Sequence, residues 1–208
     1  MSGTDGDVPR PIRVLAGQTE IGDLVFIRVR AAVFMQVAEA TGSWTNHVGV
    51  VIDAESALIA ESKFPLSGTT TLTRFVRRSA GGRVAVARLR RGLNPMQQRR
   101  VVEAANRRSG SVYDTGFNLD SRRQFCSRYA REVLAEATGK HLGEIQTFTD
   151  LLQHHRDAAL WFWQLWYFGR IPWHRETVTP ASLLQSPEVE IVFDGHASLD
   201  GRDLIDRP

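Results

Sequence analysis

The chain has 208 residues, of which 42% are hydrophobic and 24% are charged, and its formal net charge is +3. This composition is typical of a globular protein and excludes wholesale disorder, collagen-like repeats and a coiled coil. The charge is unevenly distributed, because eleven arginines and a single acid lie between Arg74 and Arg108. Either these arginines pair with acids elsewhere, or they form a basic face for an anionic partner such as a phospholipid headgroup, an acidic substrate or a nucleic acid.

The predicted elements follow a lead over residues 1–18 that contains two prolines and no sustained periodicity. In chain order we expect a strand at 24–27, a helix at 31–41, strands at 47–52 and 57–62 that form a hairpin, a strand at 72–76, a turn at Gly81-Gly82, a strand at 84–89, helices at 95–107 and 125–138, a short helix at 180–184 and a strand at 190–193. Strands followed by helices without regular βαβ alternation indicate the α+β class. Residues 19–194 are expected to form one domain, and residues 195–208 a polar tail.

Three features of the sequence bear on where in the cell the protein is located. The first ten residues lack the apolar core of an export signal, and no run approaches the ~20 apolar residues of a transmembrane helix. With one cysteine, no internal disulfide is possible. A soluble cytoplasmic protein with a reduced thiol is therefore expected.

The single cysteine, Cys126, falls at the start of a predicted helix. Unpaired N–H groups at a helix N-terminus favour a thiolate over a thiol, and Arg122, Arg123 and Arg128 act in the same direction. Cys126 is accordingly either a buried structural residue or a nucleophile.

A candidate base lies at His47, which opens a predicted strand directly after a polar loop. Glu61 lies on the next strand, and a turn near residues 53–56 brings it close to His47 on the same face. Spacing thus permits a nucleophile, a base and an orienting carboxylate, although a lone histidine is also a common structural residue.

The residues around these positions resemble a known family. Residues 22–26, 46–51 and 59–61 (GDLVF, NHVGVV and IAE) are similar to strand motifs of the NlpC-type papain-like cysteine peptidases. In most members the cysteine helix precedes these strands, whereas here residues 113–117 and 125–127 follow them. That order resembles the circularly permuted YiiX/YebB-like branch, to which the segment at 179–187 is also similar. The resemblance implies a permuted papain-like fold with a mostly antiparallel sheet packed against helices and the cysteine at a helix N-terminus.

The resemblance also implies roles for individual residues. Cys126 matches the nucleophile, His47 the general base and then acid, and Glu61 the orienting third member. Tyr113 matches a tyrosine ahead of the cysteine; it is either a packed aromatic residue or a donor that helps the Cys126 N–H stabilise an oxyanion. Relatives often carry an acid two places after the cysteine, where this chain has Arg128, and this difference is expected to alter the preference for substrate charge.

An aromatic segment is the other unusual feature. Residues 161–173 contain seven of the 18 aromatic side chains and four of the five tryptophans. The segment forms either a core helix or lid over the cleft, or an interfacial or acyl-binding surface, because tryptophan and tyrosine suit the headgroup boundary.

Three functions are compatible with these features. The leading one is a cysteine-dependent hydrolase that cleaves an amide bond in a peptide or amino-acid amide through an acyl-enzyme on Cys126. The second is a lipid-directed thiol acyltransferase or hydrolase that acts on an acyl substrate at an anionic membrane surface, and the third is a catalytically silent binding module. Histidine spacing and the absence of a phosphate loop or nucleic-acid motif lead us to expect no metal, no cofactor and no nucleic-acid partner.

Overall fold

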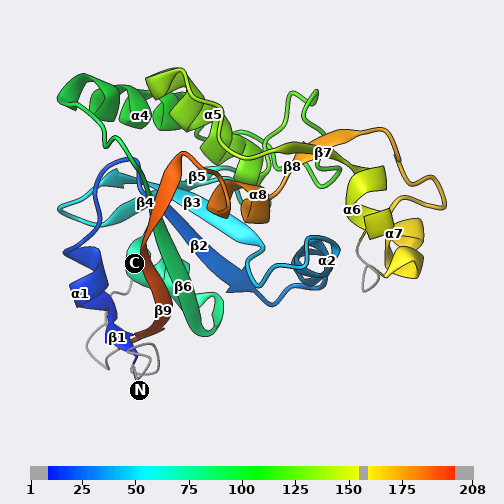
Figure 1. Ribbon diagram of the computed structural model, residues 1–208, viewed down its shortest axis with the longest axis horizontal. Coiled ribbons are helices and arrows are strands. Elements are labelled where there is room, and N and C mark those ends of the chain that lie inside the picture. Colours follow the sequence, from blue (N-terminus) through cyan, green and yellow to red (C-terminus); the bar gives the residue numbers. More distant parts are fainter. Residues whose placement is uncertain (1–8, 155–158, 200–208) are drawn as a thin grey trace.

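A seven-stranded sheet forms the centre of the computed structural model, which describes residues 9–154 and 159–199, with only the backbone of His154 (Figure 1). Its strands, in chain order, are β1 (Arg10–Pro11), β2 (Leu24–Val29), β3 (His47–Asp53), β4 (Leu58–Glu61), β5 (Gly68–Thr71), β6 (Ser79–Leu89) and β9 (Val189–Ser198). Their spatial order is β1-β9-β6-β2-β3-β4-β5, and all neighbours are antiparallel except β1 and β9. The expected α+β class with a mostly antiparallel sheet is confirmed.

Helices and a second, two-stranded sheet surround this centre. The helices are α1 (Ile12–Ala16), α2 (Ala32–Ala40), α3 (Leu72–Arg77), α4 (Pro95–Arg107), α5 (Cys126–Thr138), α6 (Phe148–His154), α7 (Leu160–Trp166) and α8 (Pro180–Leu184). The small sheet pairs β7 (Ile145–Thr147) with β8 (Glu176–Val178). In Figure 1, α4 and α7 lie at opposite ends of the molecule.

Alternate residues of the central strands enter two separate hydrophobic clusters. Leu24 and Phe26 of β2 belong to the larger cluster, which includes the buried faces of α4 and α5, whereas Val25 and Ile27 belong to the smaller cluster beneath α1 and α3. Because successive side chains of a strand point to opposite faces and both faces are covered, β2 reads as a continuous apolar run.

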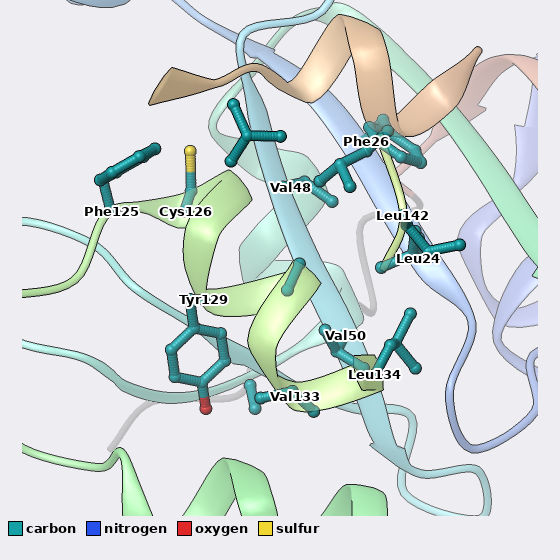
Figure 2. Packing of buried hydrophobic residues seen from close by; sticks show 14 of the residues in the cluster. Leu24, Phe26, Val48, Val50, Phe125, Cys126, Tyr129, Val133, Leu134 and Leu142 are labelled. Atoms are coloured by element: carbon teal, nitrogen blue, oxygen red, sulfur yellow. The ribbon is translucent and has the colours of Figure 1, made fainter. Parts of the chain in front are cut away.

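Helix α5 begins and ends where the sequence predicts. One face carries the buried side chains of Tyr129, Val133 and Leu134, which pack over β3 (Figure 2). Gly139 ends the helix in the left-handed conformation, with φ of 75°. This packing places the first turn of α5, which carries Cys126, beside the beginning of β3.

The strand expected at 72–76 is wrong, because these residues form helix α3. Thr71 caps the helix by accepting a hydrogen bond from the backbone N–H of Arg74. Leu72, Phe75 and Val76 have the spacing of a helical face and are buried in the smaller cluster. A six-residue helix carries too little periodicity to be distinguished from a strand without its tertiary contacts.

The turn expected at Gly81-Gly82 is also wrong, since both residues lie within β6. They adopt φ of 63° and 69°. A Cβ at Gly82 would lie 2.5 Å from the carbonyl oxygen of Ala197, so glycine here permits the close approach of β9.

Parts of the expected lead and of the expected tail belong to the fold. Residues 1–8 and 200–208 lie outside the described residues, but Ile12 and Leu15 of α1 are buried in the smaller cluster. At the other end, β9 continues to Ser198 and pairs with both β6 and β1. Tertiary burial and strand pairing therefore bring residues 10–18 and 195–198 into the fold.

Candidate active site

Cys126 is the first residue of α5 and is buried. No side chain caps this helix, because the N-cap residue is Phe125, so the N–H groups of the first turn remain available. Figure 2 shows the sulfur at this N-terminal end, on the side of the strand that carries Val48. The backbone N–H groups of Val48 and Ser127 interact with the sulfur and favour its thiolate form.

His47 is the first residue of β3 and its ring is held between aromatic neighbours. Phe75 of α3 stacks on the imidazole, with ring centroids 5.5 Å apart, and Phe34 of α2 meets it edge-on at 6.0 Å. A Cβ at Gly49 would lie 2.9 Å from the Phe75 ring, so glycine leaves the space that this stacking requires. The two rings fix the plane of the imidazole.

The loop before His47 is tied to the neighbouring strand β2. The side-chain oxygen of Asn46 accepts a hydrogen bond from the backbone N–H of Val29 at 2.7 Å, and its amide nitrogen donates to the carbonyl of the same residue at 2.9 Å. The Asn46 side chain thus continues the hydrogen bonding between β2 and β3 beyond the end of β3, and it fixes the position of the next residue, His47.

Glu61 ends β4, and its carboxylate is fully buried at 0% exposure. The antiparallel register that pairs Val50 with Ala60 places Glu61 one step further along, on the same face as His47. Its Oε2 accepts a hydrogen bond of 2.6 Å from Nε2 of His47. His47 Nδ1 is buried and, apart from its interaction with Cys126, has no hydrogen-bond partner among the described residues.

Two cations share the Glu61 carboxylate. Arg78, the residue after α3, donates from Nη2 to both oxygens at 2.8 and 2.7 Å, and Lys63 Nζ lies 3.3 Å from Oε1. Their side chains are 34% and 38% exposed, so water reaches both. The guanidinium of Arg78 also lies 4.9 Å from the centre of the Phe75 ring. The same helix therefore positions both the stacking ring and the cation.

Burial and charge shift the pKa values of these groups in directions that favour an ion pair. Burial lowers the pKa of His47, but Cys126 and Glu61 outweigh it and raise that pKa to about 9. Burial raises the pKa of Glu61, whereas His47 and Arg78 lower it to about 2. Burial also raises the pKa of Cys126, yet the charge of His47 and its hydrogen bonds bring the pKa below its ordinary value. The arrangement stabilises a thiolate beside an imidazolium.

Tyr113 lies beside the sulfur, in the segment before α5 that pairs with Gln124. Its hydroxyl is buried and has no partner that meets hydrogen-bond geometry among the described residues. Burial, followed by the charge of Cys126, raises its pKa well above the ordinary value, and the backbone N–H of Cys126 opposes this shift. A neutral hydroxyl thus faces both the thiol and that N–H.

A pocket extends from Cys126 between α2, α6, α7 and α8, and we call it the α2–α7 pocket. It is lined by Phe34, Val37, Ala40, Thr41, Asn46, Phe117, Phe125, Cys126, Ser127, Phe148, Leu151, Leu152, Trp163, Thr177, Val178, Thr179 and Pro180. Apart from Cys126, none of these side chains is ionisable, and most are apolar. His47 is not among them.

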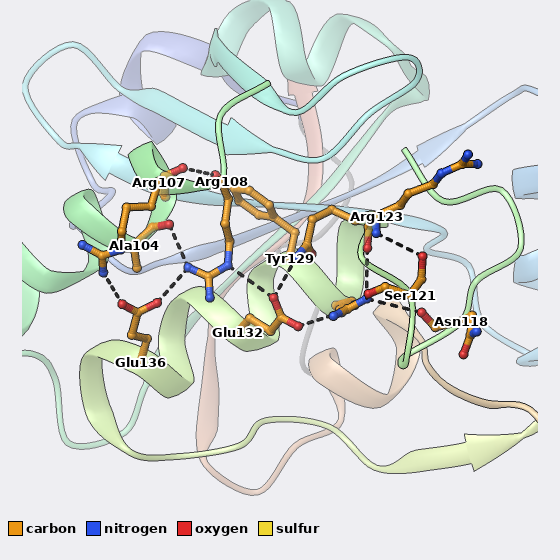
Figure 3. Close-up of polar contacts among 12 residues, drawn as sticks. Ala104, Arg107, Arg108, Asn118, Ser121, Arg123, Tyr129, Glu132 and Glu136 are labelled. Carbon is orange, nitrogen blue, oxygen red and sulfur yellow. Dashed lines mark hydrogen bonds and ion pairs between the residues drawn. The ribbon is translucent and has the colours of Figure 1, made fainter. Parts of the chain in front are cut away.

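Arg128 turns away from this pocket. Its Nε contacts Glu132 at 2.6 Å, one helical turn along α5, and its Nη1 donates to backbone carbonyls of Asn118, Ser121 and Arg123. Glu132 in turn contacts Arg108 of the segment after α4 (Figure 3). Arg128 therefore fastens the loop that leads into Cys126, and its effect on substrate charge stays a prediction.

Many arginines of the 74–108 segment pair with acids. Such pairs join Arg78 to Glu61, Arg83 to Asp194, Arg88 to Glu20 and Asp23, Arg107 to Glu136, and Arg108 to Glu132 and Glu136. The last two link α4 to α5 (Figure 3). Because α4 and α7 lie at opposite ends of the molecule, the arginine-rich helix and the aromatic helix do not form one surface.

The aromatic helix α7 has one buried face and one exposed face, so each of the two expectations for this segment holds for one face. Trp163 is 2% exposed and packs edge-on against Phe117 and Phe148. On the outer side, Trp161 and Leu165 are 68% and 71% exposed. One face is therefore core and the other is an exposed apolar surface. No helix in the described part of the chain is long and apolar enough to cross a membrane.

Within residues 9–154 and 159–199, no three side chains of histidine, cysteine, aspartate or glutamate gather closely enough to hold a metal ion.

The structure brings together all four residues singled out from sequence: Cys126, His47, Glu61 and Tyr113. The sequence does not single out Arg78 or Phe75. Recognition of α3 from the threonine cap and the helical spacing that follows it would have placed both beside the hairpin.

Comparison with known proteins agrees with this geometry. The family model of permuted papain-like amidase enzymes, YaeF/YiiX of the C92 family, matches residues 18–193. The Escherichia coli (strain K12) protein YiiX is 27% identical over 184 residues, covering 87% of this chain and 89% of that protein. The crystal structure described as metalloprotein yiiX from Escherichia coli O157:H7 superposes with a TM-score of 0.80 at 24% identity, covering 86% of this chain and 99% of that one. The expected permuted papain-like fold is thereby confirmed.

Proposed function

We propose, because the chain belongs to the YaeF/YiiX (C92) family of permuted papain-like amidases, that it hydrolyses the amide bond of a peptide or amino-acid amide through a thioester on Cys126. The observation that supports this proposal is that a thiol, an imidazole and a carboxylate lie next to one another. The only thiol of the chain lies at the uncapped start of a helix, beside an imidazole whose other nitrogen donates to a buried carboxylate. These are the parts of covalent catalysis by an activated thiol.

In the first half-reaction, the Cys126 thiolate attacks the carbonyl carbon and a C–S bond forms. Nδ1 of His47 then gives its proton to the departing amine as the C–N bond breaks, which leaves a neutral imidazole and a thioester. In the second half-reaction, Nδ1 takes a proton from water while the water oxygen attacks the thioester. The C–S bond breaks, and the thiolate and imidazolium return.

Surrounding residues hold this chemistry in place. Glu61 keeps Nε2 of His47 as a donor, so that Nδ1 faces the sulfur. Arg78 fixes the carboxylate by binding both of its oxygens. The Tyr113 hydroxyl and the Cys126 N–H are the donors for the oxyanion that forms on the carbonyl oxygen.

Alkylation and turnover test this proposal together. Because Cys126 is the only cysteine, the mass of the iodoacetamide adduct reports this site alone. At pH 6.5 the wild-type protein should react faster than a model thiol, and His47→Ala should slow the reaction, because the thiolate loses its cationic partner. The exposed His141 provides the control variant, His141→Ala, which should not change the rate.

Turnover is measured on fluorogenic peptide and amino-acid amides with the same variants. Cys126→Ala should abolish hydrolysis while the protein stays folded, as judged by its Tm. If alkylation is the same in wild type and His47→Ala, the pairing of thiol and imidazole is wrong.

A second candidate, a lipid-directed acyltransferase or hydrolase with the same triad, is favoured by the exposed face of α7. Besides Trp161 and Leu165, Phe168 just beyond the helix is 92% exposed, and such residues suit a membrane interface. Cosedimentation with vesicles of zwitterionic or anionic lipid, over a range of salt, tests this candidate. Leu165→Ser should weaken binding, whereas Met96→Ser on α4, with a side chain 63% exposed, serves as the matched control. Absence of binding to either vesicle would exclude it.

A further inference from the structure

The loop over residues 114–118 follows Tyr113, and side chains from the end of α7 and from the segment before β8 hold it. We propose that Arg175, which immediately precedes β8, is a positioning residue: through this loop it keeps the Tyr113 hydroxyl where the oxyanion forms. Arg175 acts through Tyr113 rather than on the thiol. This inference rests on the proposed function, because it concerns a donor that stabilises the oxyanion on the way to the thioester.

The Tyr113 hydroxyl is not held by a hydrogen bond of its own in the free protein. It is buried, and it has no partner with hydrogen-bond geometry among the residues that the structure describes. Its position therefore depends on the backbone that carries it and on packing against Phe34, whose ring meets it edge-on at 6.2 Å. An oxyanion donor must point at the place where charge develops, so a shift of this backbone lowers the rate.

Backbone hydrogen bonds anchor both ends of the loop, whereas its middle is strained. The N–H of Asp114 donates to the Gln124 carbonyl at 2.7 Å, and the N–H of Leu119 donates to the Glu176 carbonyl at 3.2 Å. Between these ends, Phe117 has a φ of 50°, in the left-handed region that a residue with a Cβ rarely adopts. Such a conformation persists only where surrounding contacts hold it.

Three side-chain donors supply these contacts by binding two successive carbonyls of the loop. Trp166 Nε1 donates to the Thr115 carbonyl at 3.0 Å. The Gly116 carbonyl accepts from the Tyr167 hydroxyl at 3.1 Å and from Arg175 Nη1 at 2.9 Å. Because a carbonyl oxygen has two lone pairs, these two donors saturate it. The Arg175 guanidinium also lies 5.5 Å from the centre of the Tyr167 ring, so the cation and the phenol stabilise each other.

The buried carboxylate of Asp114 links Gly116 to Tyr113. Its two oxygens accept from the backbone N–H groups of Gly116 at 2.8 Å and of Asn118 at 3.2 Å. A Cβ at Gly116 would lie 3.1 Å from Asp114 Oδ1 and 3.2 Å from Arg175 Nη1, so glycine lets both groups approach the same residue closely. Loss of Arg175 therefore loosens Gly116 and, through Asp114, the residue next to Tyr113.

A double-mutant cycle, measured on fluorogenic amides, tests whether Arg175 acts through Tyr113. Arg175→Met removes the donor and should lower kcat about tenfold while KM changes less than about threefold, because the oxyanion is present only in the transition state. In a protein that already carries Tyr113→Phe, the same substitution should change kcat by less than about twofold. A further tenfold loss in the double variant would show that Arg175 acts independently of the hydroxyl and would overturn the inference.

Three further variants separate positioning from a general loss of structure. Arg131 of α5 is the matched control, because it is also partly buried and its Nη1 binds the carbonyls of Leu142 and Gly143; Arg131→Met should leave kcat within about twofold. Arg175→Lys keeps a donor and should restore kcat to within about threefold of wild type. Tyr167→Phe should lower kcat about threefold, and its effect should also vanish in Tyr113→Phe, which decides the question if Arg175→Met fails to fold. Equal losses in Arg131→Met and Arg175→Met would overturn the inference.

Fluorine NMR reports on Tyr113 without turnover. The chain has three tyrosines, so protein labelled with 3-fluorotyrosine gives three resonances, and Tyr113→Phe identifies the one that belongs to Tyr113. Arg175→Met should shift or broaden this resonance, whereas Arg131→Met should leave it unchanged. A Tyr113 resonance that is the same in wild type and Arg175→Met, in a protein that hydrolyses amides, would overturn the inference alone. A wild-type protein that hydrolyses no amide would overturn the proposed function, and the inference with it.

Discussion

Replacement of Glu61 by glutamine tests the electrostatic basis of the site, because it removes one charge and keeps the shape of the side chain. The carboxylate is fully buried and accepts from His47, whose pKa it helps to raise from 6.5 to about 9. A raised pKa stabilises the folded protein fully below the unfolded value and not at all above the folded one. At 1.36 kcal/mol per unit, the contribution is at most about 3 kcal/mol at pH 6 and less than about 0.1 kcal/mol at pH 10.

Part of this contribution comes from Cys126 and survives the substitution. We therefore expect Glu61→Gln to lose about 2 kcal/mol at pH 6, which for a chain of this size lowers Tm by roughly 4–8 °C. At pH 10 His47 is neutral in both proteins, and the loss should fall well below about 1 kcal/mol. Arg78 and Lys63 add little, because each is about a third exposed and regains water.

The low pKa of Glu61 sets the acid limit of the pH range in which the site stabilises the folded protein. A depressed carboxylate pKa contributes stability above its ordinary value of 4.5 and loses it as the pH falls through about 2. The site should therefore be most stabilising between about pH 4.5 and 6.5, where both groups are charged in the folded protein.

Urea unfolding followed by tryptophan fluorescence at pH 6 and pH 10 measures both losses. Glu136→Gln is the matched control, because Glu136 pairs with two arginines but is 39% exposed. It should cost no more than about 1 kcal/mol, and the Glu61→Gln effect should be the larger at pH 6. Equal losses at the two pH values in Glu61→Gln would show that the carboxylate acts through Arg78 and Lys63 and not through the charge of His47, and the reasoning from the His47 pKa would be refuted.

Three further results are expected. The kcat/KM for an amide should follow a bell-shaped pH profile, with its acid limb below the ordinary thiol pKa and its alkaline limb at about 9, where His47 loses its proton; an acid limb at the ordinary value would contradict the lowered thiol pKa. Tyr113→Phe should lower kcat by roughly 10- to 100-fold with unchanged or higher Tm, because it removes an oxyanion donor whose hydroxyl is unpartnered in the free protein. Tyr129→Phe is its control; it loses a bond to a backbone carbonyl and should cost about 1 kcal/mol without affecting kcat. Trp163→Ser should cost about 3–5 kcal/mol and lower Tm by roughly 6–20 °C, whereas Trp161→Ser on the exposed face should stay within about 0.5 kcal/mol; equal effects would contradict the two-faced helix.

Local signals in the sequence predict the elements that carry the site. Asn94 followed by Pro95 predicts the start of α4, and the structure has the full capping box there. The apolar face from Tyr129 to Ala137 and the glycine after it predict α5, and hence the position of Cys126 at a helix start. These features depend on a few neighbouring residues, so the sequence carries them without knowledge of the fold.

The pairing of His47 with Glu61 can also be predicted from the sequence, because a tight hairpin fixes which residues of two strands face each other. Its register brings the imidazole and the carboxylate together. The approach of Cys126 is different. It comes from a helix 79 residues further along the chain, and only the resemblance to a family with that order of motifs predicts it.

Tertiary structure alone decides the role of residues whose local pattern is ambiguous. The segment at 72–77 is apolar and short enough to be a strand or a helix, and burial under the sheet selects the helix that delivers Phe75 and Arg78 to the site. The aromatic helix α7 is apolar at every position except Gln164, so its sequence does not specify which aromatic side chains are covered. Packing against Phe117 and against Phe148 of α6 buries Trp163, whereas Trp161 stays exposed to solvent. Burial depends on the neighbours that a side chain meets, and those neighbours are distant in sequence.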